Sequence, residues 1–384
     1  MTARPGAASM QDGAVLVTGA TGFLGLEVLT RLIDRTDRPI FAVVRAPDDR
    51  AADERLRDLL RRERGSDEEL DGRVVAVRGD IEQPALGLDD ERQEHLTERV
   101  TDVLHIAATV SFTLPFRESR QINVGGTKHA LEFAERCRQR GEFCRFSYVS
   151  TAYVAGTHEG AFSEDDLDVG QGFHNAYEAT KFEAECLVRA HAEHMQIQVF
   201  RPSIIVGDST TGRTSSFNVI YAPLRAFQQQ RIYAIPGASR APVDVVPIDF
   251  VADAITELVE HPEPERNTHH LVAGRDASTV GEMVDLAARH FGKRRPSVIP
   301  AGIYIPLIRP LVLAMSPGKG RKILRRLEVF TPYFSLPVRY EDSRTRRRLS
   351  RAGISVRPVS EYFGQLMDYA IRAEWGKAEV PREG

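Results

Sequence analysis

One stretch near the beginning of the chain limits the fold more than any other. Residues 14–17 form an apolar run, and a turn containing Gly19, Gly22 and Gly25 follows it directly. Apolar residues then recur at helical spacing through 26–33. A strand, a glycine turn and a helix in this order predict a βα unit whose backbone can approach a pyrophosphate at the helix N-terminus. A tight βα turn without a ligand is the alternative.

Short apolar runs alternate with helical patterns through the first half of the chain. The runs cover 40–44, 74–77, 103–108 and 146–149. Alternation of this kind is typical of a parallel sheet with helices on both faces. We therefore predict an α/β fold with a doubly wound parallel sheet of the Rossmann type and a smaller, mainly helical C-terminal substrate domain.

Two domains are expected in the 384 residues. The Rossmann domain would comprise 12–207 and 243–275, and the substrate domain would comprise 208–242 and 276–384. Residues 1–11 are small and polar and lack the apolar run of a signal peptide, so we expect a flexible tail.

Composition excludes several classes of protein. Hydrophobic residues at 42% and charged residues at 27% are typical of a soluble globular protein, and the net charge of -3 gives no indication of nucleic acid binding. Cys137, Cys144 and Cys186 lack C-x-x-C spacing, so neither disulfides nor zinc are predicted and a cytoplasmic location is the simplest. His191 and His194 have no further ligand at metal spacing, so no metal is expected.

The second apolar run ends in a basic residue. Arg45 stands where an NAD-selective protein usually has an acid that binds the ribose hydroxyls. Arg45 could instead bind a 2'-phosphate, with Arg55 as a second contact, so NADPH is predicted in preference to NADH. The alternative is a surface arginine, with Asp48 or Asp49 selecting the cofactor.

Tyr177 and Lys181 are four residues apart in a segment with a helical pattern. At this spacing both side chains leave the same face of a helix. A lysine there can lower the pKa of the phenol and hold a sugar hydroxyl, so that the tyrosine exchanges a proton with a carbonyl oxygen. Without further context, the pair could also lie by chance on a solvated helix face.

Several motifs occur together with this pair and in a fixed order. They are the spacing G-x-x-G-x-x-G, a Ser-Thr at 150–151, Tyr-x-x-x-Lys and Arg201-Pro202. In this combination the chain resembles the extended short-chain dehydrogenase/reductases. The resemblance implies that Thr151 is the hydroxyl partner of Tyr177, with Ser150 as the alternate, and that Lys181 holds the cofactor ribose.

The resemblance also implies a set of cofactor contacts. Asp80 and Ile81 would contact the adenine, and Asn123, at the beginning of a long helix, would order water or backbone around the lysine; otherwise Asn123 is a helix cap. His105, in the middle of a predicted strand, is expected to be a hydrogen-bonded core residue. The remaining expected contacts are Gly19, Thr21, Gly22, Phe23, Leu24, Gly25, Arg45, Arg55, Ala107, Ala108, Lys181 and Pro202.

Within that family the chain most resembles thioester reductase domains and fatty acyl-CoA reductases, the male-sterility-type group. The segments that carry this likeness are 43–46, 206–209 and 246–252. The implied reaction is NADPH-dependent reduction of a long, apolar acyl thioester to the aldehyde or onward to the alcohol. No adenylation or carrier domain is recognised, so the substrate would arrive on coenzyme A or a separate acyl-carrier protein.

Three other functions stay open on the sequence. Two share the fold: a ketone or sterol-type alcohol dehydrogenase, and a sugar-nucleotide epimerase or reductase. The third is a module that senses NADP without catalysis, which would not need Thr151, Tyr177 and Lys181 together.

Residues 297–315 are strongly apolar, but three prolines and Arg309 interrupt them, which is unlike a membrane span. They could line an acyl tunnel, dock on a bilayer or form a buried helical hairpin. Peripheral membrane contact through 297–326 is therefore an expectation. Basic residues that follow could bind coenzyme A phosphates, an acidic carrier protein or anionic lipid, or form a solvated helix face: Lys319, Arg321, Lys322, Arg325, Arg326, Arg344, Arg346, Arg347 and Arg348.

Overall fold

The computed structural model describes most of the chain: residues 13–67, 72–217, 219–229, 232, 234–263, 267–310 and 328–380. The predicted tail, the end of the apolar stretch and the first five of its basic residues lie outside the described residues. Two compact units are distinguished. The first unit comprises Met1–Val154, Asn175–Arg201 and Ala252–His269, and the second comprises Ala155–His174, Pro202–Val251 and His270–Gly384.

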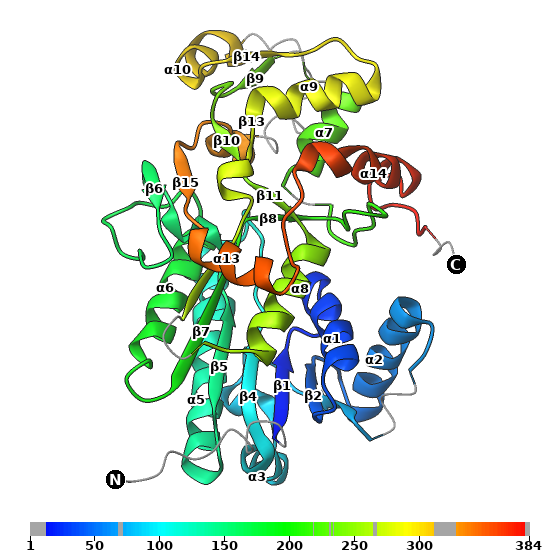
Figure 1. Cartoon of the computed structure of the whole chain (residues 1–384), viewed down its shortest axis with the longest axis vertical. Coiled ribbons are helices and arrows are strands. Elements are labelled where there is room, and N and C mark those ends of the chain that lie inside the picture. Colours follow the sequence, from blue (N-terminus) through cyan, green and yellow to red (C-terminus); the bar gives the residue numbers. More distant parts are fainter. Residues whose placement is uncertain are drawn as a thin grey trace. The chain divides into compact units, whose positions relative to one another are not determined.

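A parallel sheet forms the centre of the first unit (Figure 1). In the described residues it has seven strands in the order β12-β7-β5-β4-β1-β2-β3, and the chain order reverses between β1 and β4. The predicted doubly wound fold is thereby confirmed. The bounds are β1 Ala14–Thr18, β2 Ile40–Val44, β3 Val74–Arg78, β4 Val100–His105, β5 Arg145–Val149, β7 Gln196–Pro202 and β12 Thr268–Leu271.

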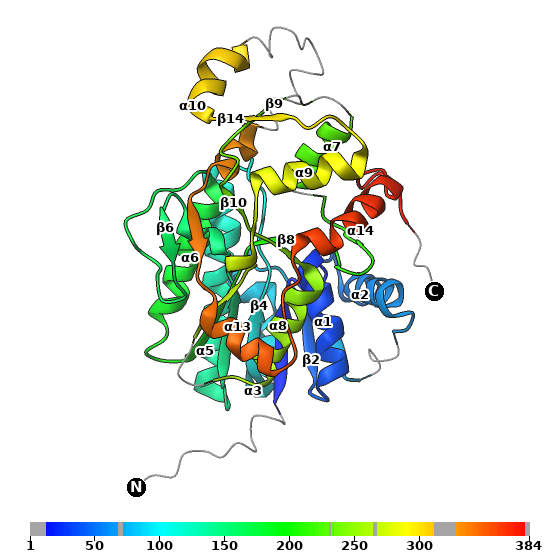
Figure 2. The same cartoon turned by 45° about the horizontal axis from the view of Figure 1, so that its top comes forward.

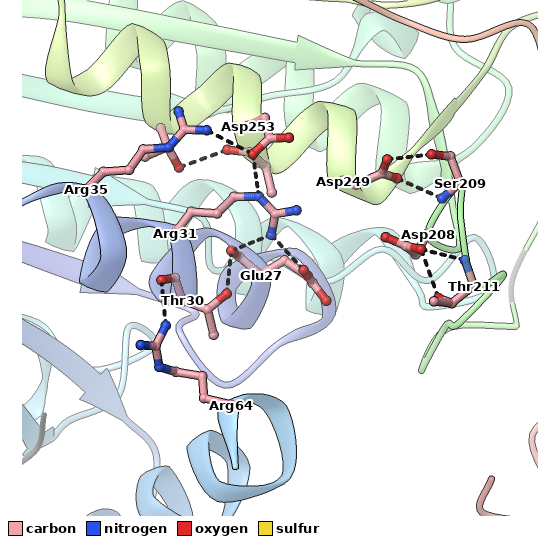
Figure 3. Close-up of polar contacts among 12 residues, drawn as sticks. Glu27, Thr30, Arg31, Arg35, Arg64, Asp208, Ser209, Thr211, Asp249 and Asp253 are labelled. Carbon is pink, nitrogen blue, oxygen red and sulfur yellow. Dashed lines mark hydrogen bonds and ion pairs between the residues drawn. The ribbon is translucent and has the colours of Figure 1, made fainter. Parts of the chain in front are cut away.

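Helices cover the sheet in two rows. α3, α5 and α6 pack against one another, while α1 packs against α2 and is linked to α8 by ion pairs of Arg31 and Arg35 with Asp253 at 2.8 and 3.1 Å (Figure 3). Arg31 also pairs with Glu27 one turn earlier at 2.7 Å. The bounds are α1 Phe23–Arg35, α2 Asp49–Arg64, α3 Asp90–Arg99, α4 Phe116–Arg120, α5 Gly126–Arg140, α6 Ala176–Ala190 and α8 Ile248–Glu260.

The second unit combines short strand pairs with helices. Its loop at 208–211 is held to the first turn of α8, where Ser209 Oγ donates to Asp249 Oδ2 at 2.6 Å (Figure 3). α9 lies beside α14 (Figure 2). The bounds are β6 Gly160–Phe162, β8 Ile204–Val206, α7 Tyr221–Gln228, β9 Ala234–Pro236, β10 Pro242–Val243, β11 Val245–Pro247, β13 Ser278–Thr279, α9 Val280–Phe291, β14 Ser297–Ile299, α10 Ala301–Ile303, β15 Val338–Tyr340, α13 Ser343–Arg351 and α14 Val359–Arg372.

The described part of the apolar stretch is not a buried hairpin. β14 pairs with β9, and no residue from 301 to 310 is buried. Ile303, Ile305 and Leu307 are 49, 50 and 66% exposed. Among the described helices, none is both long enough and apolar enough to cross a bilayer.

A buried ion network ties the base of the sheet together. Asp102 on β4 accepts from Arg145 on β5 at 2.7 Å and from Arg38, and Arg145 also donates to the carbonyl of Val259 at 2.7 Å. Asp102 is 3% exposed and Arg145 is 1% exposed. An arginine buried to this extent depends on its counter-charge, because water cannot replace the lost partner.

The Asp102→Asn substitution should therefore lower the free energy of unfolding by about 3–5 kcal/mol. Denaturant titration of the purified protein measures this change. Arg140→Gln is the matched control, since it breaks an exposed ion pair with Glu94 at 3.2 Å and should cost less than about 1 kcal/mol. Equal losses in the two variants would contradict this view of the network.

Candidate active site

Three consecutive residues at the end of β5 contact three residues on one face of α6. The ammonium of Lys181 donates to the carbonyl of Val149 at 2.7 Å. Ser150 Oγ donates to Glu185 Oε2 at 2.6 Å. The hydroxyl of Thr151 is hydrogen-bonded to the phenol of Tyr177. We call these contacts the β5–α6 ladder; it assigns the two neighbouring hydroxyls to different partners.

Tyr177 lies at the beginning of α6, which Asn175 caps by accepting from the amide of Glu178 at 3.1 Å. Its ring centroid is 5.5 Å from that of Phe112. Burial of the phenol raises the pKa of Tyr177 to about 12, and the hydrogen bond with Thr151 lowers it in part. At neutral pH the tyrosine is therefore protonated and can act as an acid.

Lys181 is 2% exposed and lies beside the end of β5, with its ammonium 4.2 Å from the ring centroid of Tyr148. Burial lowers the pKa of Lys181 to about 7, and the negative charge of Glu185 raises it. A lysine with this pKa changes charge close to neutral pH, which is a feature of functional sites.

The predicted core histidine is confirmed. His105 Nδ1 lies 2.7 Å from Thr18 Oγ1, and its Nε2 lies 3.2 Å from Thr127 Oγ1. Burial, with the charge of Lys181, lowers the pKa of His105 to about 3, so the ring is neutral. Both ring nitrogens lie within hydrogen-bonding distance of threonine hydroxyls, so neither nitrogen of His105 is available as a catalytic base.

The glycine turn after β1 packs so closely on neighbouring backbone that side chains would not fit at two of its glycines. Gly19 has φ +76°, and a Cβ there would lie 2.6 Å from the amide nitrogen of Ala107. A Cβ on Gly25 would lie 2.0 Å from the carbonyl oxygen of Gly19. Gly22 precedes α1 and gives its first turn no side-chain cap. The tight turn brings the first helix amides close to the end of β1, an arrangement that fits a pyrophosphate.

Other predicted cofactor residues surround this turn. Thr21 belongs to it, and Phe23 and Leu24 begin α1. β4 ends at His105 rather than continuing to Ala108, because Ala107 leaves the sheet to pack on Gly19, where its amide donates to Thr18 Oγ1 at 3.4 Å.

Two arginines meet at the end of β2. Arg55 Nη1 donates to the carbonyl of Arg45 at 2.9 Å, and the guanidinium of Arg45 is 72% exposed with Glu82 at 3.3 Å. The two alternative selecting acids are engaged elsewhere. Asp48 caps α2 by accepting from Ala51 at 2.8 Å, and Asp49 is paired with Arg92 at 2.5 Å.

The predicted adenine contacts form a compact loop. Asp80 Oδ1 accepts from the amide of Glu82 at 3.0 Å. The carbonyl of Ile81 lies 2.8 Å from His129 Nδ1 on α5, and its side chain packs so closely on Gly126 that a Cβ there would be 2.7 Å from Ile81 Cδ1. The loop is thus fixed to the beginning of α5.

Asn123 is not a helix cap. It lies inside a continuous helical stretch formed by α4, the π-helix Gln121–Gly125 and α5. Its side chain accepts from the amide of Thr109 at 2.8 Å and donates to Thr180 Oγ1 at 3.0 Å. Asn123 therefore orders the residue next to Lys181 and the loop after β4, rather than the helix end.

The remaining sequence predictions have simpler outcomes. Pro202 ends β7 and belongs to the second unit, so its contact with a cofactor stays a prediction. Within the described ranges, no three His, Cys, Asp or Glu side chains gather as metal ligands.

Sequence reasoning did not single out Glu185, and it named Arg201 only as part of the Arg201-Pro202 motif and not as a partner of Glu185. Both are 0% exposed, and Arg201 Nη2 donates to Glu185 Oε1 at 2.7 Å. A signal was present, because Tyr177, Lys181 and Glu185 follow at intervals of four and continue one helical face.

Comparison with known proteins identifies the family. Residues 17–255 match the model of a family of NAD-binding domains described as male sterility protein. A nonribosomal peptide synthetase of Aspergillus flavus is 30% identical over 287 residues, which are 69% of this chain and 26% of that protein. The large subunit of L-2-aminoadipate reductase from Penicillium chrysogenum is 30% identical over 269 residues, 65% of this chain and 19% of that protein. The chain thus spans about a quarter or less of the length of these relatives.

A solved structure agrees with the family match. The terminal R domain from the myxalamid PKS-NRPS biosynthetic pathway superposes with a TM-score of 0.81 and 28% identity, over 96% of this chain and 92% of that one. The resemblance to thioester reductase domains is confirmed by these matches. The chain therefore belongs to the male sterility protein family of NAD-binding domains, within the extended short-chain dehydrogenase/reductase type.

Proposed function

We propose that this protein uses NADPH to reduce an acyl thioester to an aldehyde, which the same site can reduce further to an alcohol. The acyl chain is long and apolar and arrives on coenzyme A or an acyl-carrier protein. The observation that carries the proposal is the protonated phenol of Tyr177 bonded to Thr151 beside buried Lys181. The similarity to an L-2-aminoadipate reductase and to a terminal R domain supports a thioester as the substrate.

The residues of the β5–α6 ladder have distinct roles in this reaction. A bound nicotinamide would supply the hydride to the thioester carbonyl. Tyr177 donates a proton to the carbonyl oxygen as negative charge develops on it, and Thr151 holds the same oxygen. The ammonium of Lys181 would hold the ribose of the bound cofactor, and it stabilises the phenolate that forms when Tyr177 gives up its proton. The hemithioacetal then loses its thiol and becomes the aldehyde.

The chain offers a complete set of groups for the cofactor. Gly19, Gly22 and Gly25 would let the backbone approach the pyrophosphate, and Asp80 and Ile81 would contact the adenine. The helix N-terminus of α1 then faces the negative charge. Ala107 and Ala108, the small residues after β4, would let the cofactor lie close to the backbone, and Asn123 would order the surroundings of Lys181.

NADPH is favoured by the charges at the end of β2. Arg45 and Arg55 lie together there, and Arg45 is largely exposed. Asp48 accepts a hydrogen bond from Ala51 and Asp49 is paired with Arg92, so neither carboxylate is placed to bind the ribose hydroxyls of NADH. A 2'-phosphate would gain charge-assisted hydrogen bonds from the two guanidinium groups.

The direct test is a panel of substrates with matched acyl groups. Purified protein is given NADPH with acyl-coenzyme A, acyl-carrier protein, aldehyde or ketone, and both NADPH oxidation and free thiol are followed. We expect thiol release equal to the aldehyde and alcohol formed. Oxidation of NADPH by ketones alone would refute the proposal, and no oxidation with any substrate would favour a sensing module.

Tyr177→Phe should lower kcat by about a hundredfold to ten-thousandfold, because the proton donor is lost. NADPH should still bind with nearly unchanged affinity, since the phenol is not needed to hold the cofactor. Stopped-flow turnover and fluorescence titration of NADPH measure the two effects. Full turnover in this variant would remove Tyr177 from the mechanism.

Arg45→Ala should weaken NADPH binding by about tenfold to a hundredfold and leave NADH binding nearly unchanged. Calorimetric titration with each cofactor measures the difference. Arg50→Ala is the matched control, because Arg50 lies in the first turn of α2, is exposed and pairs with Glu54 at 2.7 Å. Equal losses for both cofactors would contradict the 2'-phosphate site.

A further inference from the structure

Glu185 joins three elements of the first unit. It lies on α6 one turn beyond Lys181 and is 0% exposed. One carboxylate oxygen accepts from Ser150 at the end of β5 at 2.6 Å, and the other accepts from Arg201 on β7 at 2.7 Å. A single side chain that bonds to two neighbouring strands fixes how α6 lies along the sheet.

The ion pair with Arg201 is fully enclosed. Arg201 Nε lies 3.1 Å from both carboxylate oxygens, and Arg189 Nε donates to Oε1 at 3.0 Å. Removing such charges from water costs several kcal/mol, and a buried ion pair is often no more stabilising than a well-packed apolar pair. The ion pair between Glu185 and Arg201 is therefore not explained by a gain in folding stability alone.

Ser150 couples this ion pair to the site. It lies between Val149, which accepts from Lys181, and Thr151, which bonds to Tyr177. Since the three residues are consecutive, a displacement of Ser150 moves both neighbouring contacts. Geometry at the reacting centre is sensitive to displacements of about 1 Å.

Charge is the second link between Glu185 and the site. The titratable and charged groups around Lys181 include His105 on β4, Tyr148 on β5 and Arg201 on β7, together with four residues of α6: Tyr177, Glu178, Glu185 and Arg189. Arg120 of α4 reaches α6 only at an exposed pair with Glu183. Glu178 and Glu185 are both 0% exposed, but the charge of Glu178 acts on Tyr177, whereas the charge of Glu185 acts on Lys181.

We propose that Glu185 is a positioning residue, which holds α6 in register with the end of β5 and whose negative charge favours the ammonium form of Lys181. The inference deepens the proposed function and rests on it for the role of Lys181. On this proposal, the cluster of Ser150, Glu185 and Arg201 is part of the active site and not only of the hydrophobic core.

The test separates charge from hydrogen bonding. Glu185→Gln keeps an acceptor for Ser150 and removes the charge, whereas Ser150→Ala removes the bond and keeps the charge. The chain has six lysines, so lysine labelled with ¹³C at Cε gives few NMR signals, and Lys181→Met identifies that of Lys181. The titration midpoint of Lys181 should fall by about one pH unit in Glu185→Gln and stay unchanged in Ser150→Ala.

A double variant guards against unfolding. Glu185→Gln leaves Arg201 buried without a counter-charge, which is destabilising. In Glu185→Gln with Arg201→Gln neither charge remains, and the two amides can bond to each other. The midpoint of Lys181 should lie below that of the Arg201→Gln single variant, from which this variant differs only in the charge of Glu185, and the melting temperature should be closer to that of the wild type than in Glu185→Gln.

Activity gives the second readout. Only charged Lys181 supports turnover, so activity falls as the pH rises through its pKa, and a lower pKa moves this alkaline limb of kcat/KM to lower pH. The limb should move with the NMR midpoint in the charge variants. Ser150→Ala should lower kcat about tenfold without changing the KM for NADPH. Equal Lys181 midpoints in the folded double variant and in Arg201→Gln, or full kcat in Ser150→Ala, would overturn the proposal.

The NMR measurement needs no turnover. A wild-type protein that reduces no thioester would therefore refute the proposed function alone, whereas the midpoints would still decide whether the charge of Glu185 favours the ammonium form of Lys181.

Discussion

The contact between the end of β5 and one face of α6 determines what the first unit can do. Val149, Ser150 and Thr151 bond to Lys181, Glu185 and Tyr177, and this places an acid and a buried cation at the carboxyl end of a central strand. Ligand sites of open parallel sheets lie at this edge. The glycine turn after β1 opens onto the same edge, so one sheet supplies both the cofactor cradle and the reacting side chains.

Burial gives the two side chains complementary protonation states. The phenol of Tyr177 is harder to ionise than an exposed one, and the ammonium of Lys181 is easier to neutralise. Both shifts have the same cause, the cost of placing a charge in a medium of low dielectric constant. Tyr177 therefore keeps its proton at neutral pH, whereas Lys181 can lose its proton. Small changes in the surrounding charges can then change the proton transfer from Tyr177.

Much of this could be predicted from sequence because the signals are local. The glycine turn, the interval between Tyr177 and Lys181 and the alternation of strands and helices follow from backbone geometry within a few residues. Contacts between distant segments could not be predicted. That Ser150 bonds to Glu185, that Asn123 lies inside a helix and bonds to Thr180, and that Ala107 leaves the sheet to pack on Gly19 all depend on tertiary packing.

The central claim is that hydride reaches the carbonyl carbon of a thioester at this site. NADPH deuterated on the transferring face of C4, incubated with an acyl thioester and the protein, tests it by mass spectrometry of the products. The account predicts one deuterium on the carbonyl carbon of the aldehyde, one free thiol for each aldehyde, and a second deuterium in any alcohol. Thiol release without deuterium in the product would show simple hydrolysis and contradict the account.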